Sequence, residues 1–212
     1  MKHISLLSCL IFLTLAVSAQ KPKFGLFAGP QETHSRYSIN SVKQKQESRY
    51  GFFAGASAKI PFDVNLFFAP QLFYSSKGYK VSYTERAFPP DTNAVNNQTR
   101  IHTVELAFLL QFDFGKSANH LFMRLGPSLD FQLSGREKFQ LEDNSVVDRK
   151  MVYGFAEYGH YAASMLLQAG FETKAGWIFT GHYTHGLGNL NNADDGPRIL
   201  HRALGLSVGK YL

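Results

Sequence analysis

The sequence predicts an all-β fold: an eight-stranded antiparallel up-and-down barrel whose strands cross a membrane. Apolar side chains recur at every second residue in segment after segment beyond residue 20, and no comparably long helical period occurs. The connections between these segments alternate between long polar stretches and tight turns, which is typical of membrane barrels. The composition agrees, because aromatic residues make up 14 % of the 212 residues and charged residues only 18 %.

The N-terminus has the pattern of an export signal. A polar start is followed by an apolar run from Ile4 to Val17 and by small residues up to Ala19. The run is short for a transmembrane helix, which needs about 20 apolar residues. We therefore expect residues 1–19 to be a cleaved signal peptide and residues 20–212 to be the barrel domain. The only cysteine, Cys9, lies in the leader, so the mature chain would form no disulfide.

Eight segments carry the alternating pattern, and an even number suits a closed antiparallel ring. They span residues 24–31, 50–60, 64–75, 104–114, 121–134, 162–174, 177–185 and 200–210.

The clearest case is VELAFLLQFDF, residues 104–114. Its even-numbered side chains are all apolar, whereas Glu105, Gln111 and Asp113 lie at odd positions. Because successive side chains of a strand point to opposite faces, the even positions should face lipid and the odd positions the lumen.

The longer connections are rich in polar residues, Gly and Pro. They are residues 32–48, 77–99, 135–157 and 186–198. Short turns are expected at residues 60–63, 115–119 and 174–176. We expect the long loops outside the cell and the turns, with both termini, on the periplasmic side.

A soluble barrel such as a lipocalin is the architectural alternative, and it needs an apolar interior. Here the opposite holds, because the faces across from the apolar ones are glycine-rich, small or charged. Tyr50, Tyr74, Trp177 and Tyr183 lie near strand ends on the apolar faces, as in an interfacial aromatic girdle. The pattern therefore favours the membrane barrel.

Several motifs resemble those of a known family. They are Phe73–Gly78 with its Lys-Gly strand exit, Val104–Leu110 with Ala107 where proline is usual, the Gly-Pro strand Leu125–Ser128, Gly170–Glu172, and the exit Tyr183–Leu190.

In this order, the motifs resemble the PorT-like outer-membrane β-barrel family of Bacteroidota over about residues 20–212. The resemblance implies an integral outer-membrane protein with a structural or interaction role in secretion or envelope integrity. The family's named member is linked to the type IX secretion machinery.

Charged residues on the inner faces are the first candidates for a functional site. They are Lys59, Asp63, Glu105, Asp113, Arg124, Asp130, Glu172 and Lys174. A charge in a low-dielectric space is costly unless it is paired, so we expect a polar network that plugs the lumen. A proton path or a small pore is the alternative.

Three histidines, His182, His185 and His201, form a weaker candidate site near the loop end of the last strands. The stretch His182-Tyr183-Thr184 faintly resembles the His-x-Ser pair of barrel lipid A deacylases, so a lipid A-modifying enzyme is the functional alternative. No metal-binding motif such as His-Glu-x-x-His occurs. We expect no catalytic activity, no metal and no cofactor.

The predicted outer loops contain both basic and acidic residues, and the formal net charge is a mild +6, with no run of Lys or Arg. This distribution gives little support to nucleic-acid binding. We expect the loops to contact lipopolysaccharide phosphates, outer-membrane lipid, and other envelope or secretion proteins.

Overall fold

A computed structural model describes residues 21–212, and they form strands, turns and loops. The expected signal peptide lies outside the described residues. Among residues 21–212, no helix has the length and apolar character needed to cross a bilayer.

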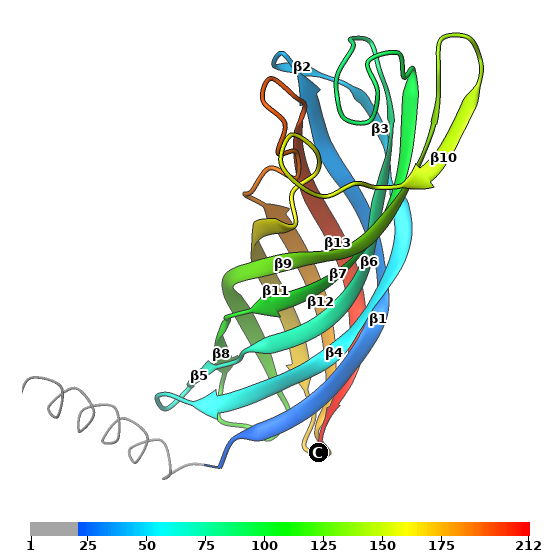
Figure 1. The fold of residues 1–212 in the computed structure, drawn as a ribbon. Helices are drawn as coiled ribbons and strands as arrows, with labels where there is room; N and C mark the ends of the chain where they lie inside the picture. The colour runs from blue at the N-terminus through cyan, green and yellow to red at the C-terminus, as the bar shows by residue number, and fades with distance from the viewer. Residues whose placement is uncertain (1–20) are drawn as a thin grey trace, which may run out of the picture.

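Eight long strands close into one antiparallel ring (Figure 1). They are β1 (Lys23–Ile39), β4 (Arg49–Pro61), β6 (Gln71–Ser82), β7 (Asn96–Ala107), β9 (His120–Gln140), β11 (Tyr161–Glu172), β12 (Trp177–Gly186) and β13 (Arg198–Tyr211). The ring closes because β13 pairs with β1 along most of its length. A closed ring leaves no unpaired backbone edge in the hydrocarbon. The predicted fold class is thus confirmed.

Two of the eight strands are interrupted at the same level. The short strand β5 (Leu66–Phe68) precedes β6 across Ala69 and Pro70, and β8 (Leu110–Phe114) follows β7 across Phe108 and Leu109. Residues 64–75 and 104–114 were each predicted to be one strand, and that prediction is wrong in this detail.

The interruptions have a physical cause. Pro70 has no N–H for the ladder, and the Ala69 N–H donates to the Leu109 carbonyl instead, at 2.7 Å. Gly126 of β9 packs directly against the second break, where a Cβ atom would lie 2.0 Å from the Phe108 carbonyl oxygen. Only glycine lets the displaced backbone lie this close to β9.

Across the interruption, the side chains of residues 104–114 keep their alternating inward and outward orientation. Glu105, Gln111 and Asp113 are buried in the lumen, whereas Phe108 is 42 % exposed and Leu110 52 % exposed. Odd positions therefore point inward and even positions outward, as predicted.

Strands also extend beyond the apolar belt into segments predicted to be loops. β1 runs on to Ile39 and turns into β2 (Val42–Lys43) through Asn40 and Ser41, whose positive φ values fit a two-residue hairpin turn. β3 (Lys45–Glu47) pairs with β6, and β10 (Val146–Lys150) pairs with β9 in a hairpin that projects from the top of Figure 1. Only the predicted loop 186–198 lies almost wholly between strands.

These extensions were missed because the polarity of the two faces inverts along the strands. In β1, apolar Phe24 and Leu26 face outward near the termini, whereas Arg36 does so at the far end. The inward side chains change in the opposite sense and form an apolar cluster, the outer cap. It consists of Tyr37, Ile39, Tyr79, Val81, Ile101, Met151, Tyr158, Leu190 and Ile199. The outer end therefore packs like a water-soluble barrel, and the rest like a membrane barrel.

Nitroxide labels test the facing of the wall. A label at position 108 should collide with lipid-soluble oxygen, and one at position 111 should be shielded from it, because these positions face opposite sides. Cys9 is the only cysteine of the sequence, so single cysteines can be placed without competing thiols once Cys9 is replaced. Equal accessibility at both positions would contradict the assigned strand facing.

Candidate functional site

The structure separates the eight predicted lumen charges into two groups. Six of them are buried inside the barrel: Lys59, Glu105, Asp113, Arg124, Asp130 and Glu172. Asp63 and Lys174 are exposed in the short turns that precede β5 and β12, so their predicted inward placement is wrong. The alternation was extended past the strand ends, where the chain reverses and the period of two no longer holds.

The lower ionic cluster lies near the end of the barrel that carries the termini. The Lys59 ammonium of β4 donates to Asp113 Oδ2 of β8 and to Glu172 Oε2 of β11, each at 2.6 Å. Lys23, whose side chain is 56 % exposed, donates to Glu172 Oε1 at 3.0 Å. Four strands that are distant in sequence are thereby tied together across the lumen.

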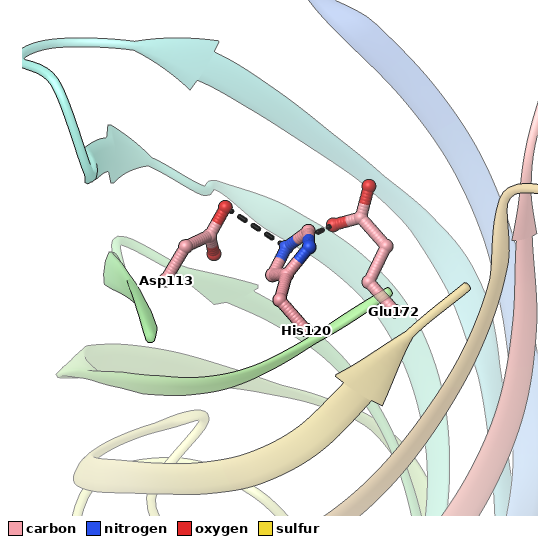
Figure 2. A group of neighbouring side chains, drawn as sticks. All are labelled: Asp113, His120 and Glu172. Carbon is pink, nitrogen blue, oxygen red and sulfur yellow. Dashed lines mark ion pairs between the residues drawn. The ribbon is translucent and has the colours of Figure 1, made fainter. Parts of the chain in front are cut away.

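His120, the first residue of β9, completes this cluster (Figure 2). Its Nε2 atom lies 3.0 Å from Asp113 Oδ2 and 3.4 Å from Glu172 Oε2, and its Nδ1 atom lies 3.0 Å from the Ser117 carbonyl oxygen. Both ring nitrogens thus face acceptors. His120 was not predicted, although it is in phase with the inward residues Phe122 and Arg124 of the same strand.

Asp113, His120 and Glu172 also have the composition of a metal site, because one ligand atom from each lies within 4.8 Å of the others. The Lys59 ammonium, however, contacts both carboxylates at 2.6 Å and lies 3.5 Å from His120 Nε2. A divalent ion would have to displace this ammonium, which already balances the carboxylate charge. The geometry therefore favours an ion-pair cluster over a metal centre.

Arg124 forms the next layer and contacts no carboxylate directly. Its guanidinium donates to Gln111 Oε1 at 2.6 Å, to Gln168 Oε1 at 3.2 Å and to the Tyr211 hydroxyl at 3.1 Å. Gln111 donates in turn to Asp113 Oδ1 at 2.5 Å, which joins this layer to the lower cluster. The buried side-chain amides of Gln111 and Gln168 thus join Arg124 to the lower ionic cluster in one hydrogen-bond network.

An apolar layer follows farther along the lumen. Along β8 and β7, Leu109 and Ala107 separate Asp113 from Glu105, and along β6 Phe73 separates Gln71 from Lys77. The layer consists of Phe53, Ala69, Phe73, Ala107, Leu109 and Leu166, with Phe27 packed against them. It divides the polar lumen into two compartments.

The upper ionic cluster lies beyond the apolar layer. The Lys77 ammonium is 2.7 Å from Glu105 Oε1 and 2.8 Å from Asp130 Oδ2, and all three side chains are at most 3 % exposed. Lys77 had been assigned to the start of a loop, and the Lys-Gly strand exit was the signal that marked it. Thr103 adds a hydrogen bond to Glu105 Oε1 at 3.2 Å.

The described lumen charges balance as a whole. Lys23, Lys59, Lys77 and Arg124 supply four positive charges against four carboxylates, with His120 counted as neutral. The carboxylates are Glu105, Asp113, Asp130 and Glu172. The balance holds for the whole lumen and not for each compartment, because the lower one has three cations against two carboxylates and the upper one has one cation against two carboxylates. Overall balance and direct pairing lower the desolvation cost of enclosing ions in a narrow barrel.

Glu137 is a further buried carboxylate, in the outer cap. It accepts hydrogen bonds from the Tyr158 hydroxyl and from Arg149 Nε, each at 2.8 Å. Burial raises the pKa of the Tyr158 phenol well above its usual value, so the phenol stays a donor. Glu137 was missed because residues 135–157 were predicted to be a loop, whereas β9 continues to Gln140. A register shift opposite His102 and Thr103 also inserts one extra residue in β9. After this bulge odd positions point inward, and Ser134 is exposed.

The three candidate histidines do not form one site. His182 is buried with its ring edge against Phe53, at a centroid distance of 4.4 Å. His201 is buried beside the Tyr79 ring, and neither of its nitrogens has a hydrogen-bond partner among the described residues. His185 faces the other side of the wall, with Nδ1 3.2 Å from the Tyr183 hydroxyl. Within residues 21–212, no histidine of this group contacts both a hydroxyl and a carboxylate, as an activated nucleophile requires.

The closed ring, the apolar outer belt and the packed polar lumen define an integral β-barrel membrane protein of the outer-membrane type. The family model described as "Outer membrane protein beta-barrel domain" matches residues 13–192, so the chain belongs to this family. Its membership places the protein in the outer membrane. No curated protein matches the sequence.

The comparison with solved structures found several outer-membrane proteins at low sequence identity. The structure of Ail from Yersinia pestis, in complex with the heparin analogue sucrose octasulfate, is 12 % identical, with a TM-score of 0.46, and the match covers 91 % of this chain and 100 % of Ail. Neisserial surface protein A (NspA) is 14 % identical, with a TM-score of 0.46 and coverage of 91 % and 100 %. OprG from Pseudomonas aeruginosa is 10 % identical, with a TM-score of 0.47 and coverage of 91 % and 97 %. Likenesses of this size say nothing about function.

The lower cluster can be tested by removing its central cation. Replacing Lys59 by Met should lower the free energy of unfolding by about 3–5 kcal/mol, because two buried carboxylates lose their shared partner. Lys23→Met is the matched control and should cost less than about 1 kcal/mol, since the Lys23 side chain is largely solvated. Urea titration of the folded, heat-modifiable band on gels measures both. Equal losses for the two variants would refute the central role of Lys59.

Proposed function

We propose that this protein is a closed, non-catalytic outer-membrane barrel whose working surface is its outer end. The observation that carries the proposal is the lumen itself: two clusters of buried ion pairs lie on either side of a buried apolar layer. A water-filled path for solutes would need a continuous polar lining. The barrel wall therefore serves as an anchor, and the function is carried by what projects from it.

The outer end has the features of an interaction surface. The hairpin of β9 and β10 extends beyond the ring, and β10 has one edge without a strand partner among the described residues (Figure 1). Large apolar side chains are exposed in the outer connections, with Phe155 at 89 % and Leu187 at 57 %. Exposed apolar groups in water-facing loops favour contact with a protein partner.

The resemblance to the PorT-like family supports a finer assignment, a role in secretion or envelope integrity through contacts with other envelope proteins. The motif that bears on this most directly is the Lys-Gly strand exit, since Lys77 anchors the upper ionic cluster and Gly78 sits where a Cβ atom would come within 2.4 Å of the Thr99 carbonyl oxygen. These residues shape the barrel under the outer cap, so in this proposal they support the docking surface and do not contact the partner.

Electrical recording tests whether the lumen is closed. The purified barrel in a planar bilayer should give no steady conductance, because the apolar layer around Phe53, Phe73 and Leu109 leaves no continuous water path. A general porin measured in the same bilayers is the positive control. A reproducible steady conductance that scales with the amount of inserted barrel would overturn the closed-lumen proposal.

Photocrosslinking tests the interaction role. A photoreactive phenylalanine at position 155 should trap a specific envelope protein in whole cells, since Phe155 is the most exposed apolar side chain of the outer connections. The same group at Asn144, an exposed polar position at the hairpin tip, is the matched control. If position 155 yields only the adducts seen at position 144, the partner surface is not there and the proposal fails in this form.

A further inference from the structure

One sector of the lipid-facing wall is hollowed. Small residues line it, including Ala169 of β11 with its pairing partner Gly181 of β12, and Ala28 of β1 on the far side of β13. They form two adjoining apolar hollows of ≈ 640 Å³ and ≈ 570 Å³, which share Pro30, Ala169, Gly181 and Leu206. Because they share these four residues, the two hollows form one continuous apolar groove on the outside of the barrel, a surface suited to a hydrocarbon chain.

Basic groups stand directly beyond the outer end of this groove. At the outer end of the groove, Leu204 of β13 pairs with Glu32 of β1. Two residues nearer the outer end of β13, Arg202 pairs with His34 of β1 and with His185 of β12. These three side chains are partly exposed on the outer wall, just where the apolar belt ends. An anion at this level would meet a guanidinium flanked by two imidazoles.

The positive wall continues outward from Arg202. A polar hollow of ≈ 630 Å³ lies between the β1–β2 hairpin and the start of β13, and it is lined by Arg36, Lys43 and Arg198, with Asp195 as the acidic residue. Arg202 and Arg198 are four residues apart on one strand, about 13 Å at the usual rise. The basic surface is therefore much longer than one phosphate group.

These basic residues are also unpaired. Within residues 21–212, none of Arg36, Lys43, Arg198 and Arg202 forms an ion pair. Basic residues in the connections and strands on the other side behave differently: Lys80 pairs with Glu47, Arg86 with Glu142, and Arg136 with Asp148. Unpaired basic residues also occur elsewhere, as with Lys138, but in the sector above the groove four of them lie next to an apolar hollow.

We propose that this sector binds a phosphorylated glycolipid of the lipid A type from the outer leaflet. One acyl chain occupies the groove, the lipid A phosphate lies against Arg202, His34 and His185, and the anionic core sugars reach the hollow formed by Arg36, Lys43 and Arg198. The groove contributes apolar burial, and the guanidinium groups contribute charge-assisted hydrogen bonds. A phospholipid has one phosphate, so it would leave the outer half of the basic surface unused.

The glycolipid site rests on the proposed function in one respect only, that the end of the barrel with β2 and β10 faces outward. It gives that end a lipid ligand. Failure of the conductance or crosslinking results would leave the glycolipid site in place, and failure of the site would leave the closed barrel in place.

The test measures binding of purified bisphosphorylated lipid A that still carries its anionic core sugars to the folded, detergent-solubilised barrel by native mass spectrometry. The double variant Arg36→Gln/Arg202→Gln should weaken binding by about tenfold or more, as expected from the loss of charge-assisted contacts. The matched control is Arg136→Gln/Lys138→Gln on the outer face of β9, which should stay within about twofold of the parent. Heat-modifiable migration verifies that each variant is folded.

The acyl chain is tested separately. A Cβ atom at Gly181 would meet only Leu206 Cδ2 at 3.7 Å and the Ala169 carbonyl oxygen at 3.9 Å, so Gly181→Leu fills the groove without straining the strand. It should weaken lipid A binding, whereas Ala58→Leu on β4, away from the groove, should not.

Three outcomes would overturn the proposal. They are equal binding of dephosphorylated lipid A, equal losses in the β9 control variant, and a phosphatidylglycerol affinity that equals that of lipid A and falls with the same substitutions. The last outcome would identify a general anionic-lipid surface in place of a glycolipid site.

Discussion

A hydrocarbon bilayer offers no water to backbone N–H and C=O groups, and the closure of the ring between β13 and β1 satisfies this constraint. The rest of the structure follows from it. Once the ring must close with eight strands, its interior is only wide enough for side chains. Most inward residues are then buried, whatever their polarity, and inward charges such as Lys59 and Lys77 must find partners across the lumen. The ionic clusters are a consequence of closure, and they in turn fix which strands face one another.

The same strands are surrounded first by lipid and then by water, and the polarity of their outward side chains changes accordingly. Near the termini the outward residues are apolar, as with Leu26 of β1, and toward the outer end they become polar, as with Arg36 of the same strand. The direction of the side chains stays the same, but the solvent outside the wall changes from lipid to water. The polarity of the inward residues changes in the opposite sense, from polar to apolar. Polar inward residues such as Gln31 give way to Tyr37 and Ile39. The outer cap can therefore form a conventional apolar core, which holds the projecting hairpins at a defined height above the membrane.

This inversion explains what sequence could and could not predict. The period of two alone sufficed for the facing of residues such as Glu105 and Asp113, and for the ring of eight strands. The outer ends of the strands could not be predicted in the same way. In the sequence a strand is identified by its apolar outward face, and this face becomes polar where water replaces lipid. Glu137 illustrates a second limit, since one inserted residue in β9 reverses the phase of everything after it. Pairing across the lumen, as of Lys59 with Glu172, depends on the register of strands 113 residues apart in sequence, and no local pattern encodes that.

If the lumen is closed, as proposed, the outer surface is the place where strong interactions with other molecules are still available. Most of the buried cations already have partners inside, and several basic residues of the outer connections are neutralised by neighbours such as Glu142 and Asp148. The sector formed by β12, β13 and β1 differs because free positive charge and a hollowed apolar wall coincide there. Each feature alone is ordinary for a membrane barrel. Their alignment along the same three strands, across the level where the bilayer ends, matches a ligand that is itself apolar at one end and anionic at the other.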